Sequence, residues 1–153
     1  MKKFELTAES KNFAGKKLFR IKALLSFGNV KEGELGGFVE KEENLSDNGD
    51  AWVSGNARVS GDAEVSGNAW VYGDARVSGD ADYATVHGFG SEYRTTTFFR
   101  TKAGNIGVRC GCFYGTLEEF RAKVKETHGE TKIAKEYLMV ADLMEFRFSK
   151  EEA

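Results

Sequence analysis

The stretch Val53-Ser-Gly-Asn-Ala-Arg-Val-Ser-Gly-Asp-Ala-Glu-Val-Ser-Gly-Asn-Ala-Trp70 repeats one hexapeptide three times, and two further copies run on to Asp82. Valine recurs at intervals of six residues from Val53 to Val77, and an alanine stands four positions after each valine. A fixed period of this kind indicates a repeat architecture more strongly than local helix or strand propensities do. A period of six residues does not fit the 3.6-residue turn of an α-helix. The repeat therefore decides the fold class.

Side-chain size explains how such a repeat would fold. Each hexapeptide can form one short strand and one turn, with the valine and the alanine pointing inward and Gly-Asn or Gly-Asp at the corner. An aliphatic residue followed four positions later by a small one resembles the hexapeptide-repeat family of left-handed parallel β-helices. The match covers residues 51–82. The resemblance implies a short left-handed parallel β-helix of about three coils over residues 35–88, in which three hexapeptides close each coil.

A second period of 18 residues follows from three hexapeptides per coil. Residues 18 apart should stack at the strand spacing of about 4.8 Å. The outward position after each alanine then gives three chemically distinct faces, with Trp52 below Trp70, Arg58 below Arg76 and Glu64 below Asp82.

The flanking segments are expected to cover the ends of the repeat, because unpaired strand edges need a cap or a partner. Residues 1–34 are predicted to be an N-terminal β cap, with a strand over residues 17–25. Residues 89–153 are predicted to be a C-terminal α/β module of order ββααβ. Its strands cover 95–101 and 106–113, and its first helix follows the capping box of Thr116 and Glu119 and ends at Gly129. A second helix over 132–144 and an edge strand over 145–148 complete it.

The composition indicates which kinds of partner and which cellular compartment to expect. A net charge of −2 gives no basic surplus, so nucleic acid is not expected as a partner. No apolar run approaches the roughly 20 residues of a membrane helix, and the start Met1-Lys2-Lys3-Phe4 lacks the apolar segment of a signal peptide. Two cysteines do not make a disulfide framework. The expected location is the cytoplasm.

The sequence offers few candidate residues for catalysis or for binding a cofactor or a metal ion. Many hexapeptide-repeat proteins are acyltransferases with a histidine base, and His87, just after the repeat, is the fallback candidate for that role. His128 lies at a predicted helix C-terminus, where a cation is favourable without any catalytic role. Cys110 and Cys112 have no further Cys or His nearby to complete a metal site. No enzyme activity, metal or cofactor is expected.

Binding is the better-supported class, and two sets of residues are candidates for it. Large aromatic side chains on one flat face, namely Trp52, Trp70 and Tyr72, favour an interface with a second copy, as a trimer or dimer, or with another protein. Arg58 and Arg76 have two interpretations that the sequence leaves open. They are either a solvated ladder, neutralised by Glu64 and Asp82 of a neighbouring subunit, or a clamp for an anion or nucleotide.

The segments Leu35-Gly-Gly-Phe-Val39, Cys110-Gly-Cys-Phe113 and Gly115-Thr-Leu-Glu-Glu-Phe120 are similar to segments of uncharacterised phage and prophage proteins that carry this β-helix. That resemblance implies a protein made in the cytoplasm of an infected host. The favoured hypothesis is a non-catalytic protein that assembles through its β-helix and inhibits a host defence or regulatory protein. The alternatives are an oligomeric sponge for an anionic signalling nucleotide and a divergent acyltransferase.

Overall fold

An N-terminal hairpin opens the fold. The structure, a computed structural model, describes residues 2–90, 94–111 and 113–149. Strands β1 (Phe4–Phe13) and β2 (Lys16–Ala23) are antiparallel. Ala14 and Gly15, with φ of 50° and 83°, give the tight turn the two positive angles of a type I′ hairpin. Ile21 and Ala23 of the predicted strand are buried in the core of the repeat.

The repeat contributes short parallel strands to two sheets. These are β4 (Trp52–Val53), β5 (Arg58–Val59), β6 (Trp70–Val71) and β7 (Arg76–Val77), preceded by β3 (Leu35–Val39) and the 3-10 turn η1 (Glu42–Asn44). A five-stranded mixed sheet has the order β1-β2-β3-β5-β7, and β4 pairs with β6 in a two-stranded parallel sheet.

The predicted 18-residue stacking is confirmed on two faces. Trp52 pairs with Trp70 across β4 and β6, and Arg58 pairs with Arg76 across β5 and β7. The inward positions are also as predicted: at most 1% of each side chain is exposed for Val53, Ala57, Val59, Ala63, Val65, Ala69, Val71, Ala75 and Val77.

The prediction of a left-handed parallel β-helix is nevertheless wrong. The described strands form a mixed sheet, a two-stranded parallel sheet and an antiparallel sheet, and they do not close into a solenoid. On the third face Val65 makes only an isolated bridge, with Leu45. The first face is continued by the antiparallel hairpin, and after the turn η2 (Asp80–Asp82) the chain leaves the repeat for an antiparallel strand. Both ends of the repeat thus merge into sheets formed with the flanking segments.

The C-terminal part is four strands followed by two helices. Strands β8 (Tyr83–Phe89), β9 (Arg94–Arg100), β10 (Ile106–Cys110) and β11 (Phe113–Thr116) form an antiparallel sheet of order β11-β10-β9-β8. The predicted order ββααβ is therefore wrong. The segment where the repeat pattern fades is itself a strand, β8.

The helices α1 (Leu117–His128) and α2 (Lys132–Phe148) cover one face of this sheet. The capping box is confirmed: the Thr116 hydroxyl accepts from the Glu119 backbone N–H, and the Glu119 carboxylate accepts from the Thr116 N–H. The predicted edge strand over residues 145–148 is wrong, because α2 continues through it and buries Met144 and Phe148 on its inner face. Neither helix has the length and apolar content needed to cross a membrane, considering the described residues.

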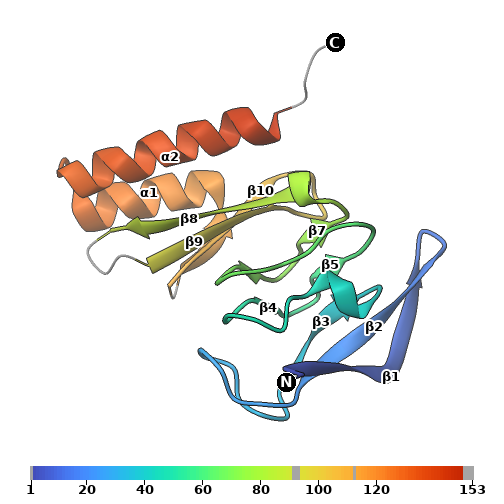
Figure 1. The fold of residues 1–153 in the computed structure, drawn as a ribbon. Coiled ribbons are helices and arrows are strands. Elements are labelled where there is room, and N and C mark those ends of the chain that lie inside the picture. Colours follow the sequence, from blue (N-terminus) through green and yellow to red (C-terminus); the bar gives the residue numbers. More distant parts are fainter. Residues whose placement is uncertain (1, 91–93, 112, 150–153) are drawn as a thin grey trace.

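Strand β9 lies between two hydrophobic cores. Phe98 packs in the core beneath the helices, and Phe99, pointing the other way, packs in the core of the repeat. Figure 1 shows the resulting layers: the two helices, the antiparallel sheet, the repeat strands and the N-terminal hairpin. The repeat is therefore covered by the hairpin at one end and by the antiparallel sheet at the other.

Candidate functional site

Arg58 and Arg76 lie side by side on the outer face of the parallel strands β5 and β7. Their neighbours Val59 and Val77 point inward and are buried, so the alternation of a strand turns both arginines outward. Both side chains line the same hollow, which has a volume of about 310 Å³. The sequence period thus brings two guanidinium groups together at one site.

The tip of the N-terminal hairpin forms the opposite wall of this hollow, which we call the arginine pocket. Its lining consists of Phe13, Ala14, Lys16, Leu18, Arg58, Ser60, Arg76, Val77 and Ser78. The tight turn at Ala14 and Gly15 brings the ends of β1 and β2 together, so that an aromatic ring and an ammonium group flank the two arginines. The pocket therefore combines apolar walls with three cationic side chains.

The two guanidinium groups are held in place by different contacts. The guanidinium carbon of Arg58 lies 3.3 Å from the centroid of the Phe13 ring, a cation–π contact. Nη1 of Arg76 donates to the carbonyl oxygens of Asn56 at 3.1 Å and Ala75 at 2.8 Å. Each group is thus positioned before any ligand arrives.

The charges of the arginine pocket are incompletely neutralised. Neither Arg58 nor Arg76 forms an ion pair with a carboxylate in the part of the chain that the structure describes. Partial burial lowers the pKa of both guanidinium groups, and for Arg76 the neighbouring Arg58 lowers the pKa further, whereas Asp74 acts to raise it. Arginine nevertheless stays charged in proteins. An anion between the two groups would relieve their repulsion.

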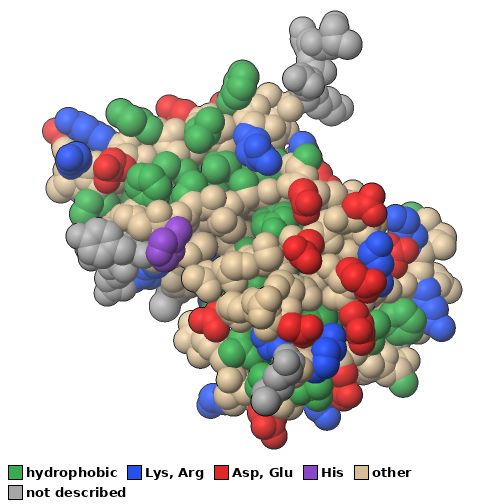
Figure 2. All heavy atoms as spheres, in the orientation of Figure 1, with side chains coloured by type: hydrophobic (Ala, Val, Ile, Leu, Met, Phe, Trp, Pro, Cys, Tyr) green, Lys and Arg blue, Asp and Glu red, His purple; other side chains and the backbone are tan. Residues whose placement is uncertain are grey.

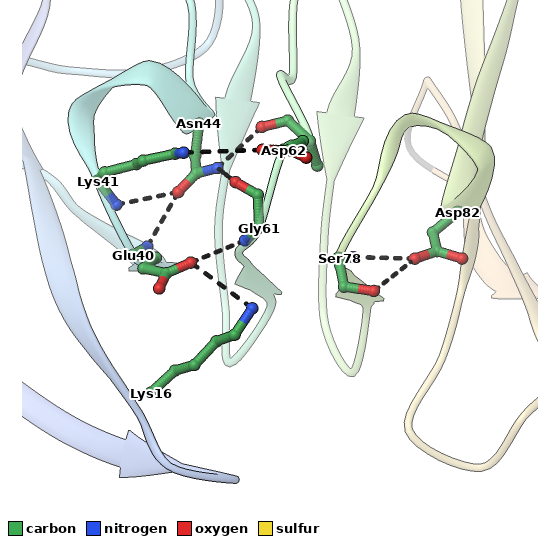
Figure 3. A network of polar contacts seen from close by, with 9 residues as sticks. Lys16, Glu40, Lys41, Asn44, Gly61, Asp62, Ser78 and Asp82 are labelled. Atoms are coloured by element: carbon green, nitrogen blue, oxygen red, sulfur yellow. Dashed lines mark hydrogen bonds and ion pairs between the residues drawn. The ribbon is translucent and has the colours of Figure 1, made fainter.

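Lys16 has one acidic neighbour, Glu40, at 3.9 Å. The same Glu40 oxygen accepts a hydrogen bond from the Gly61 N–H at 2.8 Å, so this carboxylate is shared with the backbone (Figure 3). Glu40 is shared in this way, and Asp74 acts on Arg76 without forming an ion pair, so the three cations of the pocket are only partly balanced.

No protein-family model and no curated protein matches this chain. The function of the arginine pocket is therefore argued from its geometry and charges.

Trp52 does not contribute to an exposed aromatic face. The expectation that it would is wrong, because only 1% of the residue is exposed. Its ring packs edge-to-face on Phe27 at a centroid distance of 5.4 Å. The loop between β2 and β3 supplies Phe27 and makes Trp52 a core residue.

Trp70 and Tyr72 are half-buried at the junction with the antiparallel sheet. The Arg109 guanidinium lies over both rings, 4.1 Å from the Trp70 centroid and 4.9 Å from that of Tyr72. Trp70 also donates from Nε1 to the Ser54 hydroxyl at 2.7 Å, and Tyr72 packs on Tyr114. These aromatics therefore make contacts within the chain, where the sequence suggested contacts between chains.

The two acidic residues do not form the stacked pair that the period predicts. Glu64 is exposed, whereas Asp82 lies in η2 and accepts hydrogen bonds from Ser78 (Figure 3) and, at 2.8 Å, from Arg100. The Ser78 and Arg100 hydrogen bonds lower the pKa of Asp82 although its burial opposes this. Asp82 thus fixes the exit of the chain from the repeat.

The candidate histidines lie apart from the arginine pocket. His87 is exposed on β8, with Nδ1 2.8 Å from the Thr95 hydroxyl oxygen. His128, at the end of α1, lines a second hollow of about 300 Å³ between the helices and the antiparallel sheet. There the Tyr137 hydroxyl donates to the Phe89 carbonyl oxygen, and its burial, together with nearby Cys110, raises the tyrosine pKa to about 12.

Cys110 is half-buried and accepts a hydrogen bond from the Thr96 hydroxyl at 3.1 Å. Cys112, the other cysteine, lies outside the described residues. No group of three or more His, Cys, Asp or Glu side chains in the described ranges is arranged to hold a metal ion.

The sequence interpretation missed Phe13 and Lys16, which complete the arginine pocket. The signal that could have found them is the Ala14-Gly15 pair between two segments of strand-like composition, a pattern that favours a hairpin turn. Neither residue has a periodic relation to the repeat, so the sequence gives no register for placing them beside Arg58.

Proposed function

We propose that the protein is a non-catalytic binding protein that holds a small phosphate-bearing ligand of the nucleotide class in the arginine pocket. The observation that carries the proposal is the pairing of Arg58 with Arg76 on one wall of a hollow, without an ion pair to a carboxylate for either among the described side chains. Guanidinium groups are the preferred side chains for recognising phosphate, because their planar N–H donors match its oxygens.

The rest of the pocket supports a ligand larger than a bare phosphate. A volume of about 310 Å³ is at the lower end of small-molecule sites. Phe13, which is half-buried, and Ala14, which is exposed, give the wall an apolar part that could cover a sugar or base, and Ser60 adds a hydroxyl. Lys16 at the rim would add a third cation for a phosphate oxygen. This proposal corresponds to sequestering an anionic nucleotide.

The other two hypotheses, inhibition of a host protein and acyl transfer, are supported by fewer features of the structure. Inhibition of a host protein was suggested by an exposed aromatic face, and Trp52 is buried while Trp70 and Tyr72 are engaged by Arg109. An acyltransferase would use His87, which is not part of the wall of the arginine pocket. Binding without catalysis is therefore the function that the geometry supports best.

Titration calorimetry with AMP and with inorganic phosphate tests the proposal. AMP should bind more tightly than phosphate, and added salt should weaken both. Arg58→Gln and Arg76→Gln should each weaken AMP binding by about tenfold or more, because each removes a charge-assisted hydrogen bond.

Lys17→Gln is the matched control. Lys17 neighbours Lys16 on β2 but points to the opposite face of the strand, so its loss should leave AMP binding unchanged. Unaltered binding in both arginine variants, or no binding of AMP to the wild-type protein at millimolar concentrations, would refute the proposal.

A further inference from the structure

The outer face of α2 carries an apolar stripe that no other described part of the chain covers. Met139, Leu143 and Phe146 are 70%, 57% and 79% exposed. Their spacings of four and three residues place them on one side of the helix. Figure 2 shows hydrophobic side chains along the upper margin of the molecule, over α2.

This stripe is unusual because the opposite side of α2 is already used. Tyr137, Ala141 and Met144 are buried in the core between the helices and the antiparallel sheet. A surface helix normally has one apolar face and one polar face, whereas a helix that is apolar on both sides is buried on both. Three large side chains in a row also exceed the scattered apolar residues of an ordinary surface. The outer face of α2 is therefore suited to being covered by a partner.

The charges beside the stripe indicate which partner fits. Glu136 and Arg147 flank it on one side, near opposite ends, and Lys135 and Asp142 flank it on the other side. In an antiparallel pair of identical helices, each flank faces the same flank of the partner with the ends exchanged. Glu136 then meets Arg147 of the partner, so this flank pairs opposite charges twice.

The apolar residues agree with the same alignment. The midpoint between Met139 and Leu143 and the midpoint between Glu136 and Arg147 both fall next to Ala141. One twofold axis at that point therefore serves the contact between Met139 and Leu143 and the ion pairs between Glu136 and Arg147 together.

We propose that the outer face of α2 is the contact surface of a twofold homodimer, in which the α2 helices of two copies pack antiparallel through Met139, Leu143 and Phe146. Such an interface uses the same patch on both copies, which is the commonest arrangement among small oligomers. The proposal is independent of ligand binding in the arginine pocket. It also places self-association on a helix, away from the repeat strands where the sequence suggested it.

Sedimentation equilibrium over the micromolar range tests the proposal. The wild-type protein should be a dimer that dissociates on dilution. Leu143→Asp should raise the dissociation constant at least about tenfold, because it places a carboxylate at the centre of the interface. Leu35→Asp is the matched control: Leu35 on β3 is 54% exposed, so the same substitution should leave the dimer intact. Far-UV circular dichroism checks that both variants are folded.

A charge exchange tests the antiparallel geometry. Glu136→Arg alone and Arg147→Glu alone should each weaken the dimer, and the double variant should restore it. A wild-type protein that is monomeric at every concentration, or a Leu143→Asp variant that dimerises like wild type, would overturn the proposal. A double variant no stronger than the single ones would overturn the antiparallel arrangement.

Discussion

At the scale of single residues, Asn44, in the turn that precedes the repeat, makes four side-chain hydrogen bonds. It is completely buried at the end of η1. Its side-chain oxygen accepts from the backbone N–H groups of Glu40 and Lys41, and its amide group donates to the carbonyl oxygens of Gly61 and Ala63 (Figure 3). One side chain thus joins the first turn to the turn of the next layer.

Replacing Asn44 by alanine should lower the free energy of unfolding by about 2–4 kcal/mol, because it leaves several buried backbone groups without hydrogen-bond partners. Urea titration followed by tryptophan fluorescence measures the change. Asn48→Ala, at an exposed position in the same loop, should change stability by less than about 0.5 kcal/mol. Similar losses in the two variants would contradict the role given to Asn44.

The sequence predicted the two arginines of the pocket but mistook the tryptophans. A fixed period sets the register between Arg58 and Arg76, and the Phe13 ring against Arg58 leaves both side chains half-buried at the pocket wall. Trp52 obeys the same period, yet it is covered by Phe27 from a loop that has no periodic relation to it. Burial depends on such long-range contacts, and a repeat contains no information about what packs against it.

At the scale of secondary-structure elements, the corner glycines of the repeat differ in what lies above them. Gly61 and Gly67 both have positive φ, 63° and 66°. A Cβ added at Gly61 would clash with the carbonyl oxygen of Ser78 in the next layer, whereas one added at Gly67 would meet no atom within 4 Å. Substitutions at these two corners therefore distinguish the cost of backbone strain from the cost of steric contact.

Gly67→Ala should destabilise the protein by about 1–2 kcal/mol, the strain of an alanine in the left-handed region. Gly61→Ala should lose about 1–3 kcal/mol more, because the two layers must also move apart. Thermal unfolding of both variants measures the difference. Equal losses would contradict the close approach of Gly61 to Ser78.

Element boundaries were predictable where a local chemical signal marks them. Thr116, Glu119 and Gly129 fix the ends of α1 by capping, and the structure agrees. The end of α2 was missed because Glu145-Phe-Arg-Phe148 alternates as a strand does. Burial of Phe148 four residues after Met144 identifies it as helix, but only once the sheet beneath is known. The β-helix prediction failed for the same reason: the repeat sets local pairing, and the flanks decide which sheets result.

At the scale of the whole molecule, the two cores meet along β9, so the chain should unfold as one cooperative unit. Both tryptophans belong to the repeat, and both helices belong to the C-terminal part. Urea curves followed by tryptophan fluorescence and by far-UV circular dichroism should therefore coincide. Two separate transitions would contradict this coupling.

Substitution within β9 sharpens this experiment. Phe98→Leu removes packing only from the core beneath the helices, and Phe99→Leu removes it only from the core of the repeat. Each should lower stability by about 1 kcal/mol or more, and each should shift the fluorescence and dichroism curves together. A Phe98→Leu variant that moves the dichroism curve alone would indicate two independent domains.

Thr96, Thr97, Phe98 and Phe99 are four consecutive residues of β9 that are at most 1% exposed. A strand with one solvent-exposed face tolerates substitutions at every second position, because alternate side chains reach solvent. Here both faces are occupied, so a saturation scan of the whole chain should find an unbroken block of intolerant positions at 96–99. Amino-acid substitutions should accumulate most slowly there during evolution, because each change in β9 must be compatible with the packing of both cores.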